Sequence, residues 1–321
     1  MTERTTDHPD IAELLPRLNA DDAAVRRIAL IDLADLEESE GLPWLTDALL
    51  VDSSTEVRTE AARLLEAWEQ PDVVQALCAA LADSAEPVRL AAAQSLSELK
   101  SLEAGLLILP WVTHADAFVR ASALRALREL RLEDAAGPAL LALQDADAAV
   151  RREAVGILGW LKHEPALPAL AGLAAQEPDT EVRRAAIGAL GLARDSSVLP
   201  ALTAALRDEA WQVREEAATT LGKVGHAQAG PALVEALADD YWQVRLRAAR
   251  SLGRLRFRQA LQGLAELLGH GIANLRKEAA LALGELGDSA ALPALRNAEA
   301  DSDPEVRKAV RIALAQLQGA A

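Results

Sequence analysis

Residues 208–224, with the sequence DEAWQVREEAATTLGKV, contain the pattern that decides the fold. Val213, Ala217, Leu221 and Val224 follow one another at intervals of four, four and three, which places them on one stripe of an α-helix. The Val-Arg dipeptide of this stretch recurs every 31 or 32 residues, with Leu275 once in place of valine, at Arg26, Arg58, Arg89, Arg120, Arg151, Arg183, Arg214, Arg245, Arg276 and Arg307. A period of this length indicates stacked helical repeats that bury their apolar faces against one another.

An acidic residue lies six positions before the arginine in most repeats. It is found at Asp52, Asp83, Asp145, Glu177, Asp208, Asp239 and Asp301. This position allows two roles, because the carboxylate is placed either to cap the second helix of its own repeat or to accept a hydrogen bond from the arginine of a neighbouring repeat.

The first helix of the repeat is marked by a Pro-Ala-Leu element. Its prolines are Pro138, Pro168, Pro200, Pro231 and Pro293, and they are predicted to lie near the first turn, where a missing N–H donor is tolerated. Glycines share one register eight residues after the arginine, at Gly159, Gly191, Gly222, Gly253 and Gly284. Glycine is unfavourable inside a helix, so we expect a close approach of the next helix at this position.

The combination of Asp-x5-Arg, a Val-Arg-x2-Ala-x3-Leu-Gly helix and Leu-Pro-Ala-Leu resembles the HEAT-repeat class, specifically the short HEAT-like repeats named after phycobilisome lyases. The resemblance covers Asp21 to Leu317. It implies that the second helices line a concave surface and the first helices a convex one. We therefore expect an all-α, right-handed superhelix of about ten HEAT-like repeats, a fold that hosts many activities.

Composition and linkers fit one helical domain. Hydrophobic residues make up 51% of the chain and aromatic residues 3%, and no linker rich in Pro, Gly or Ser interrupts the period. Residues 11–321 are therefore expected to form a single solenoid, preceded by a loose polar tail over residues 1–10 that is not a signal peptide. The longest stretch without charge or histidine, Pro165 to Gln176, is too short to cross a bilayer, so no membrane partner is expected.

Charge and cysteine content restrict the partners and the compartment. The chain has 49 acidic against 33 basic residues and a formal charge of -16, which argues against nucleic-acid binding. The single cysteine, Cys78, excludes an intramolecular disulfide and is compatible with a reducing compartment, and a cytoplasmic location is the default expectation. Because Cys78 lies in an apolar run without a neighbouring base, we expect a small buried side chain.

The histidines do not form a catalytic or metal-binding constellation. His114 and His270 take the place of the acid before second helices, and His163 and His226 lie where acidic residues begin other first helices, so capping or loop roles are expected. His163-Glu164 is similar to the His-Glu pairs of HEAT-like deoxyhypusine hydroxylases, but a di-iron centre needs several such pairs. We expect no catalytic residue, no metal and no cofactor.

Aromatic residues mark the candidate binding surface. The apolar stripe occupies positions -1, +3, +7 and +10 relative to the arginine, so -3, -2, +1, +2, +5 and +9 are predicted to point outward. Four of the nine aromatic residues fall on these positions, namely Phe118, Trp160, Trp211 and Trp242. The last two occupy the same slot in adjacent repeats and are expected to stand side by side as binding anchors.

Arginines add positive charge to the same face of the eighth repeat. The predicted partner-binding patch consists of Phe118, Trp160, Trp211, Gln212, Tyr241, Trp242, Gln243, Arg247, Arg250 and Arg254. It suits a protein or peptide with acidic and aromatic or apolar features. In the alternative interpretation, the tryptophans cover the next helix and the arginines are solvated or pair with Glu215 and Glu216.

Two functional hypotheses follow. The first is a non-enzymatic scaffold or adaptor that holds a protein or peptide in its concave groove. The second, which the resemblance to bilin lyases implies, is a lyase-like or chromophore-handling protein whose arginines meet the propionates of a tetrapyrrole and whose tryptophans stack on its ring. The charge disfavours a third hypothesis, in which the protein acts on nucleic acid.

Overall fold

The structure is a computed structural model that describes residues 4–319. The chain forms two compact units, which divide between Leu161 and Lys162. Among the described residues there are α-helices and short 3₁₀-helices and no β-strand, so the predicted all-α fold is confirmed. The two units are described separately below.

Within residues 4–319, each unit contains five pairs of antiparallel helices. The helices of the first unit are α1 (Pro9–Leu18), α2 (Ala23–Ala34), α3 (Leu42–Val51), α4 (Thr55–Leu64), α5 (Pro71–Ala80), α6 (Glu86–Ser97), α7 (Leu102–Ile108), α8 (Ala117–Leu130), α9 (Ala136–Ala142) and α10 (Ala148–Trp160). Those of the second unit are α11 (Leu167–Gln176), α12 (Thr180–Ala189), α13 (Leu199–Ala205), α14 (Trp211–Val224), α15 (Gly230–Ala236), α16 (Trp242–Arg254), α17 (Leu261–Leu267), α18 (Ala273–Leu286), α19 (Leu292–Asn297) and α20 (Pro304–Gly319). One odd-numbered helix and the following even-numbered helix make one repeat.

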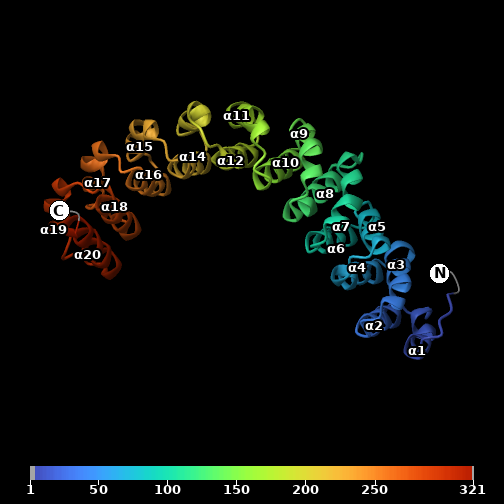
Figure 1. The fold of residues 1–321 in the computed structure, drawn as a ribbon. Coiled ribbons are helices and arrows are strands. Elements are labelled where there is room, and N and C mark those ends of the chain that lie inside the picture. Colours follow the sequence, from blue (N-terminus) through green and yellow to red (C-terminus); the bar gives the residue numbers. More distant parts are fainter. Residues whose placement is uncertain (1–3, 320–321) are drawn as a thin grey trace. The chain divides into compact units, whose positions relative to one another are not determined.

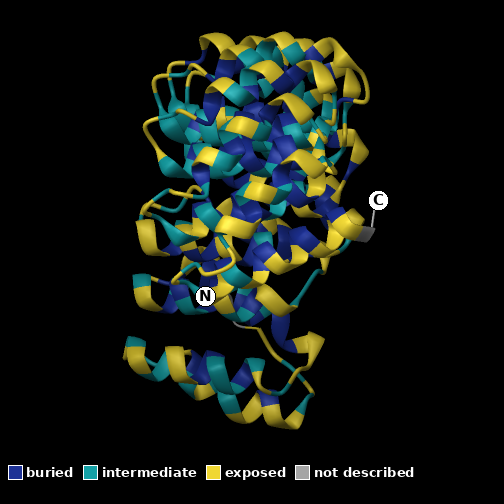
Figure 2. Ribbon diagram, turned by 90° about the vertical axis from the view of Figure 1, so that its left-hand side faces the viewer, coloured by how far each residue is buried: buried dark blue, intermediate teal, exposed yellow. Residues whose placement is uncertain are grey.

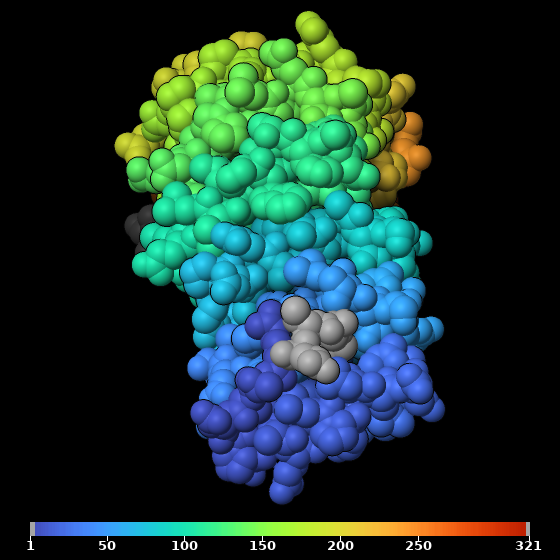
Figure 3. Space-filling view, turned by 90° about the vertical axis from the view of Figure 1, so that its right-hand side faces the viewer, coloured from blue at the N-terminus to red at the C-terminus, as the bar shows by residue number. Residues whose placement is uncertain are grey.

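The two kinds of helix form two layers in each unit. Within a unit, the even-numbered helices lie side by side along the inner side of the curve and the odd-numbered helices along the outer side (Figure 1). The buried residues lie between the layers, while exposed residues cover the edges (Figure 2). In the first unit, successive repeats follow one another in sequence order without interruption (Figure 3). A residue on an even-numbered helix is therefore either in the core, between two inner helices or on the inner surface.

The outer helices begin as the sequence predicts. Pro168, Pro200 and Pro231 occupy the first or second position of α11, α13 and α15. Short 3₁₀-helices precede most outer helices, as Ser39–Gly41, Glu133–Ala135, Glu164–Ala166, Ser196–Val198, Ala227–Ala229, Arg258–Ala260 and Ser289–Ala291. Proline costs no backbone hydrogen bond at the first turn, because an N–H group there has no partner inside the helix.

The apolar stripe of the inner helices forms the core. Val213, Ala217 and Leu221 of α14 are fully buried, and Val224 at the end of the helix is half-buried. Cys78 is also fully buried in α5. The expectations for the stripe and for the cysteine are confirmed.

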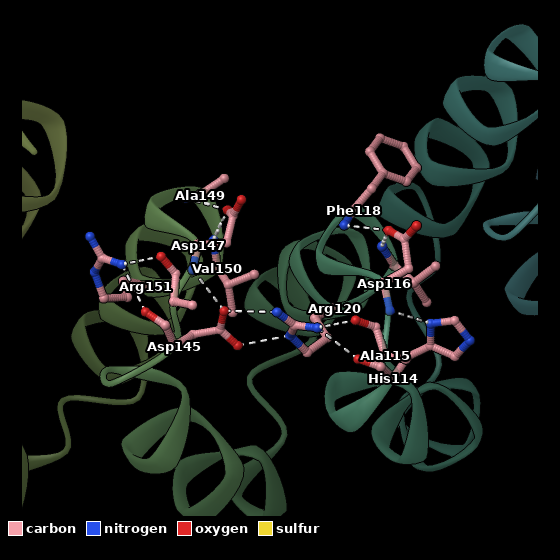
Figure 4. A network of polar contacts seen from close by, with 12 residues as sticks. His114, Ala115, Asp116, Phe118, Arg120, Asp145, Asp147, Ala149, Val150 and Arg151 are labelled. Atoms are coloured by element: carbon pink, nitrogen blue, oxygen red, sulfur yellow. Dashed lines mark hydrogen bonds and ion pairs between the residues drawn. The ribbon is translucent and has the colours of Figure 1, made fainter.

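A ladder of arginine–aspartate pairs joins successive repeats. Nε and Nη2 of Arg120 donate to the two carboxylate oxygens of Asp145 over 2.8 Å each, and Nη1 donates to the carbonyls of His114 and Ala115 over 2.8 Å (Figure 4). The same two-pronged pairs join Arg26 to Asp52, Arg58 to Asp83, Arg183 to Asp208, Arg214 to Asp239 and Arg276 to Asp301. Of the two roles open to the acid, it therefore takes the bond from the arginine.

Other residues cap the inner helices. Asp116 and Asp147 accept hydrogen bonds from the first N–H groups of α8 and α10. The ladder aspartate instead supports the loop in front of the cap, because Asp145 also accepts the N–H of Asp147 over 2.9 Å. Each ladder carboxylate thus orders its own loop and binds the preceding repeat.

Histidine interrupts the ladder at two places. Nδ1 of His114 accepts the N–H of Asp116 and Nδ1 of His270 accepts that of Ile272, over 3.1 Å each. The expected loop-ordering role is confirmed for these two residues. His163 and His226 precede 3₁₀-helices but make no capping hydrogen bond, so for them only the loop position is as expected.

Glycines allow neighbouring inner helices to approach closely. A Cβ atom on Gly284 of α18 would lie 2.7 Å from Cα of Ala313 in α20, and one on Gly253 of α16 would lie 2.9 Å from Cα of Ala282. Cβ atoms do not approach a backbone atom this closely. The predicted reason for this glycine register is therefore confirmed in the second unit.

We predict that Gly284→Ala destabilises the protein by about 1–3 kcal/mol, because α18 and α20 must separate to admit the methyl group. Urea unfolding followed by circular dichroism measures the change. Gly172→Ala in α11 is the matched control, since a Cβ atom there meets nothing within 4 Å. It should instead stabilise the helix by up to about 1 kcal/mol, and equal effects of both substitutions would contradict the packing argument.

The ladder predicts a dependence of stability on pH. The hydrogen bonds from Arg120 hold the pKa of the Asp145 carboxyl below its usual range. A lowered pKa in the folded state means that the pair stabilises the fold above about pH 4, the unfolded pKa, and that this contribution is lost as the pH falls through the folded pKa. Asp145→Asn should therefore destabilise the protein by about 1–2 kcal/mol at pH 7 and by much less near pH 2.

Urea unfolding midpoints at the two pH values provide the measurement. The control is Asp134→Asn, at an exposed residue for which the described structure contains no side-chain hydrogen bond. A pH-independent effect of Asp145→Asn would contradict the pairing.

Candidate functional site

An aromatic stack lies on the second unit where two inner helices begin. The ring of Trp211, the first residue of α14, stacks on Tyr241 with centroids 5.5 Å apart and planes 13° apart. Tyr241 precedes α16 and is 45% exposed, and the guanidinium of Arg214 lies 5.5 Å from its ring centroid. The ring partner of Trp211 is thus Tyr241, although the sequence suggested Trp242.

Trp242 and two glutamines extend this aromatic surface. Trp242 is the first residue of α16 and is half-buried, as are Gln212 and Gln243. The amide oxygen of Gln243 is buried and accepts no hydrogen bond from any residue between 4 and 319. The surface therefore offers aromatic faces together with polar side-chain groups.

The arginines of the eighth repeat are largely compensated by acidic residues of neighbouring helices. Nε of Arg247 donates to Glu215 over 2.9 Å, and Arg250 binds both carboxylate oxygens of Glu278 over 2.8 and 2.7 Å. Arg254 is exposed at the end of α16. The alternative interpretation of the sequence, in which Arg247 pairs with Glu215, is confirmed, and the positive charge of this face is smaller than the sequence alone indicates.

Position +2 after the ladder arginine was expected to point into solvent, and it does so at Ile28, which is 47% exposed, but not in every repeat. Glu153 and Glu278 occupy it and are only 4% and 7% exposed. At these two glutamates the position faces the adjacent inner helix, so the expectation is wrong in these two repeats. Acidic residues at this position therefore depend on partners supplied by the preceding repeat.

These buried glutamates differ in their partners. Side-chain nitrogen atoms of Arg125, Arg128 and Arg152 lie 3.2–3.5 Å from the carboxylate oxygens of Glu153. Glu216 occupies the same position in α14, but the preceding repeat has glycine, Gly188, where Arg125 and Arg250 stand in theirs. Burial accordingly raises the pKa of Glu216 above its usual range.

The first unit contains the other two predicted aromatic residues. The guanidinium of Arg89 lies 5.7 Å from the ring centroid of Phe118, and that of Arg131 lies 5.2 Å from the ring centroid of Trp160. Trp160 is 46% exposed. Both rings are thus ordered by arginines of the preceding repeat, and both belong to a different unit from Trp211 and Trp242.

Sequence reasoning missed a groove on the inner side of the first unit. A hollow of about 460 Å³ is lined by Leu90, Ala93, Gln94, Ala117, Phe118, Ala121, Ser122, Arg125, Asp147 and Ala149. A second hollow of about 410 Å³ adjoins it and shares Leu90 and Gln94. Leu90 is 53% exposed, and its position directly after Arg89, where other repeats have Arg27 or Arg152, is the signal that could have indicated the groove.

The cysteine and the candidate metal ligands among the described residues offer no reactive thiol and no metal-binding cluster. Burial raises the pKa of the Cys78 thiol to about 12, so this sulfur is protonated and unreactive near neutral pH. Residues 4–319 contain no group of three or more His, Cys, Asp or Glu side chains placed to hold a metal ion. In the same range, every helix is too short or too polar to cross a membrane.

Comparisons with known proteins identify the repeat. The family model for HEAT repeats matches residues 11–97, 106–187, 173–243 and 230–315. A comparison with curated proteins gives no significant match.

Among solved structures, an engineered protein is 21% identical with a TM-score of 0.56, covering 96% of this chain and 99% of its own. YibA of Escherichia coli is 21% identical with a TM-score of 0.62, covering 84% and 98%. Kap121p bound to the extreme C-terminus of the protein phosphatase Cdc14p is 13% identical with a TM-score of 0.69, covering 99% of this chain but only 42% of its own. At these identities the likeness establishes the fold alone.

The raised pKa of Glu216 in α14 gives a prediction. A pKa raised in the folded state means that the ionised Glu216 carboxylate costs stability, a cost that appears as the pH rises above the unfolded value of about 4.3. Glu216→Gln should therefore raise the melting temperature at pH 7 by about 2 °C, and the gain should disappear near pH 4. Differential scanning calorimetry measures both.

Glu215→Gln is the matched control one residue away. It removes the partner of Arg247 and should lower the melting temperature slightly, because that pair is half-exposed. A loss of stability on Glu216→Gln at pH 7 would show that the Glu216 carboxylate has a partner that stabilises it.

Proposed function

Because the chain belongs to the HEAT-repeat family, we propose that it is a non-enzymatic scaffold that binds a protein or peptide on the inner face of its helical repeats. The observation that carries the proposal is the Trp211–Tyr241 stack. Its two rings are fixed by helix starts and by Arg214, while Tyr241 stays 45% exposed. Ordered, exposed aromatic side chains supply large contact areas at a small loss of conformational entropy, which is why they dominate binding energies at interfaces.

The chemistry of this surface specifies the kind of partner. Apolar or aromatic side chains fit against Trp211, Tyr241 and Trp242, and the half-buried side chain of Gln212 supplies hydrogen bonds. Arg254 gives one exposed cation at the far end of α16. Since Arg247 and Arg250 already bind glutamates, apolar contact contributes more to this proposed interface than attraction to an acidic partner.

The fold is suited to an extended segment. Kap121p, whose structure resembles this chain, is described in complex with the extreme C-terminus of a protein phosphatase. By analogy, the inner side of each unit here, where even-numbered helices line up, offers a row of equivalent positions spaced by one repeat. Phe118 and Trp160 supply such positions in the first unit.

The tetrapyrrole alternative, which came from the resemblance to phycobilisome-lyase repeats, receives less support. It requires arginines that meet propionate groups. Arg247 and Arg250 would have to leave Glu215 and Glu278, and the second of these carboxylates would then remain charged and unpaired at 7% exposure. That loss is costly, so protein binding is the better-supported function.

We predict that the double variant Trp211→Ala, Tyr241→Ala weakens capture of the natural partner at least tenfold, because truncation of central aromatic anchors commonly costs about 2 kcal/mol or more. Affinity capture from the native host with quantitative mass spectrometry measures the loss. Circular dichroism establishes that the variant is as helical as the wild type.

The matched control is Leu141→Ala on α9 of the first unit, which removes a 79% exposed apolar side chain from an outer helix. It should leave capture unchanged. If the double variant retains its partner while Leu141→Ala loses it, binding occurs on the outer helices and the proposed surface is wrong.

A further inference from the structure

The interruption of the ladder at His114 leaves an arginine with unused donors. Nη1 of Arg89 donates to the carbonyls of Asp83 and Ser84 over 3.0 and 3.4 Å, as Nη1 of Arg120 does to the corresponding carbonyls one repeat later. This shared contact orients the planar guanidinium alike in both repeats. In both repeats the edge that carries Nε and Nη2 therefore faces the following repeat. The following repeat offers the carboxylate of Asp145 to Arg120, whereas for Arg89 the equivalent position is occupied by His114.

These two nitrogen atoms of Arg89 have no acceptor among residues 4–319, whereas both are bonded in Arg120. The second interruption, at His270, is different. There Nε of Arg245 donates to the carbonyl of Asp239, so this guanidinium has turned back toward its own loop. The unused carboxylate-binding edge is thus preserved at Arg89 and not at Arg245.

The neighbours of Arg89 leave this edge available. The central guanidinium carbon of Arg89 lies over the ring of Phe118, 5.7 Å from the ring centroid. His114 and Phe118 lie on the side of their repeat that is turned away from Asp145 (Figure 4). Arg89 is therefore held beside Phe118, while its Nε and Nη2 donors keep no acceptor among residues 4–319.

His114 adds a donor of defined direction. Its Nδ1 accepts the N–H of Asp116, so Nε2 carries the proton of the neutral ring and can donate it. A stack with Trp111, at 5.8 Å between centroids, holds the ring in place. The nearby Asp116 carboxylate already accepts the N–H groups of Phe118 and Val119 as the cap of α8.

An apolar groove begins at the same place. Phe118 and Leu90, the residue after Arg89, both line the hollow of about 460 Å³ on the inner side of the first unit. A ligand that meets the donor edge of Arg89 can therefore place an adjoining apolar group against Leu90. The chain as a whole is acidic, so attraction of an anion has to be local, within the screening distance of about 10 Å.

We propose that Arg89, His114 and Phe118 form a binding site for the carboxylate of an aspartate or glutamate side chain in a partner peptide, with the neighbouring apolar residue of that peptide against Leu90. The fork of an arginine matches a carboxylate with two parallel hydrogen bonds, the same geometry that the intact ladder pairs use. This inference rests on the proposed function and specifies the ligand chemistry of the first unit.

The test is an NMR titration of the full chain labelled with ¹⁵N-arginine. The probes are acetyl-Asp-Leu-amide and its neutral counterpart acetyl-Asn-Leu-amide, and the Nε–H signal of Arg89 is assigned by its absence in Arg89→Gln. We expect the aspartyl probe to shift this signal and the asparaginyl probe to bind at least tenfold more weakly. In His114→Asp the chain's own carboxylate reaches Arg89, so the response should be lost.

His270→Asp is the matched control, because it makes the same substitution at the other interruption and should keep the response of Arg89. Equal shifts with both probes, no shift with either, or a response that survives in His114→Asp would each overturn the proposal. The titration needs no natural partner, and the double variant Trp211→Ala, Tyr241→Ala of the capture experiment alters only the second unit. Failure at Arg89 with intact dependence of capture on Trp211 and Tyr241 would therefore leave the proposed function standing, and the converse result would leave the Arg89 site standing.

Discussion

The two-pronged bond between a ladder arginine and the aspartate of the next repeat is the interaction on which the stacking depends. Burial of the apolar stripe supplies most of the driving force, but it is not directional and tolerates sliding. The arginine fork is directional, because Nε and Nη2 must meet two carboxylate oxygens while Nη1 holds the loop of its own repeat. One side chain thus ties a loop, its helix and the following repeat into a fixed register.

Interrupting this ladder has two different consequences. Histidine replaces the aspartate at His114 and at His270, and in both places its Nδ1 takes over the hydrogen bond that orders the loop. The loops therefore keep their form, but the preceding arginine loses its partner. Arg245 turns to a carbonyl of its own loop, whereas Arg89 packs on Phe118 and keeps its donor edge toward the next repeat. Where His114 replaces the aspartate, Arg89 loses its structural pair and becomes a candidate binding group.

Many charged side chains on the inner helices form ion pairs with one another. Glu153 and Glu278 are buried between helices because arginines five positions after the ladder arginine of the preceding repeat reach them. Where Gly188 takes that place, Glu216 has no such partner and its pKa is raised by burial. The features left for recognition are aromatic rings, apolar grooves and the donor edge of Arg89.

The sequence by itself determined the helical repeat, its length, the core stripe, the close approach at Gly253 and Gly284 and the two roles open to the ladder aspartate. These follow from periodicity and from the conformational preferences of single residues, which are local properties. Only the tertiary structure decided that Trp211 stacks on Tyr241 and that Arg250 is compensated by Glu278. Those contacts join different repeats, so they depend on how far each helix is rotated against its neighbour, and a rotation of this kind is set by the packing of whole side chains and leaves no periodic trace in the sequence.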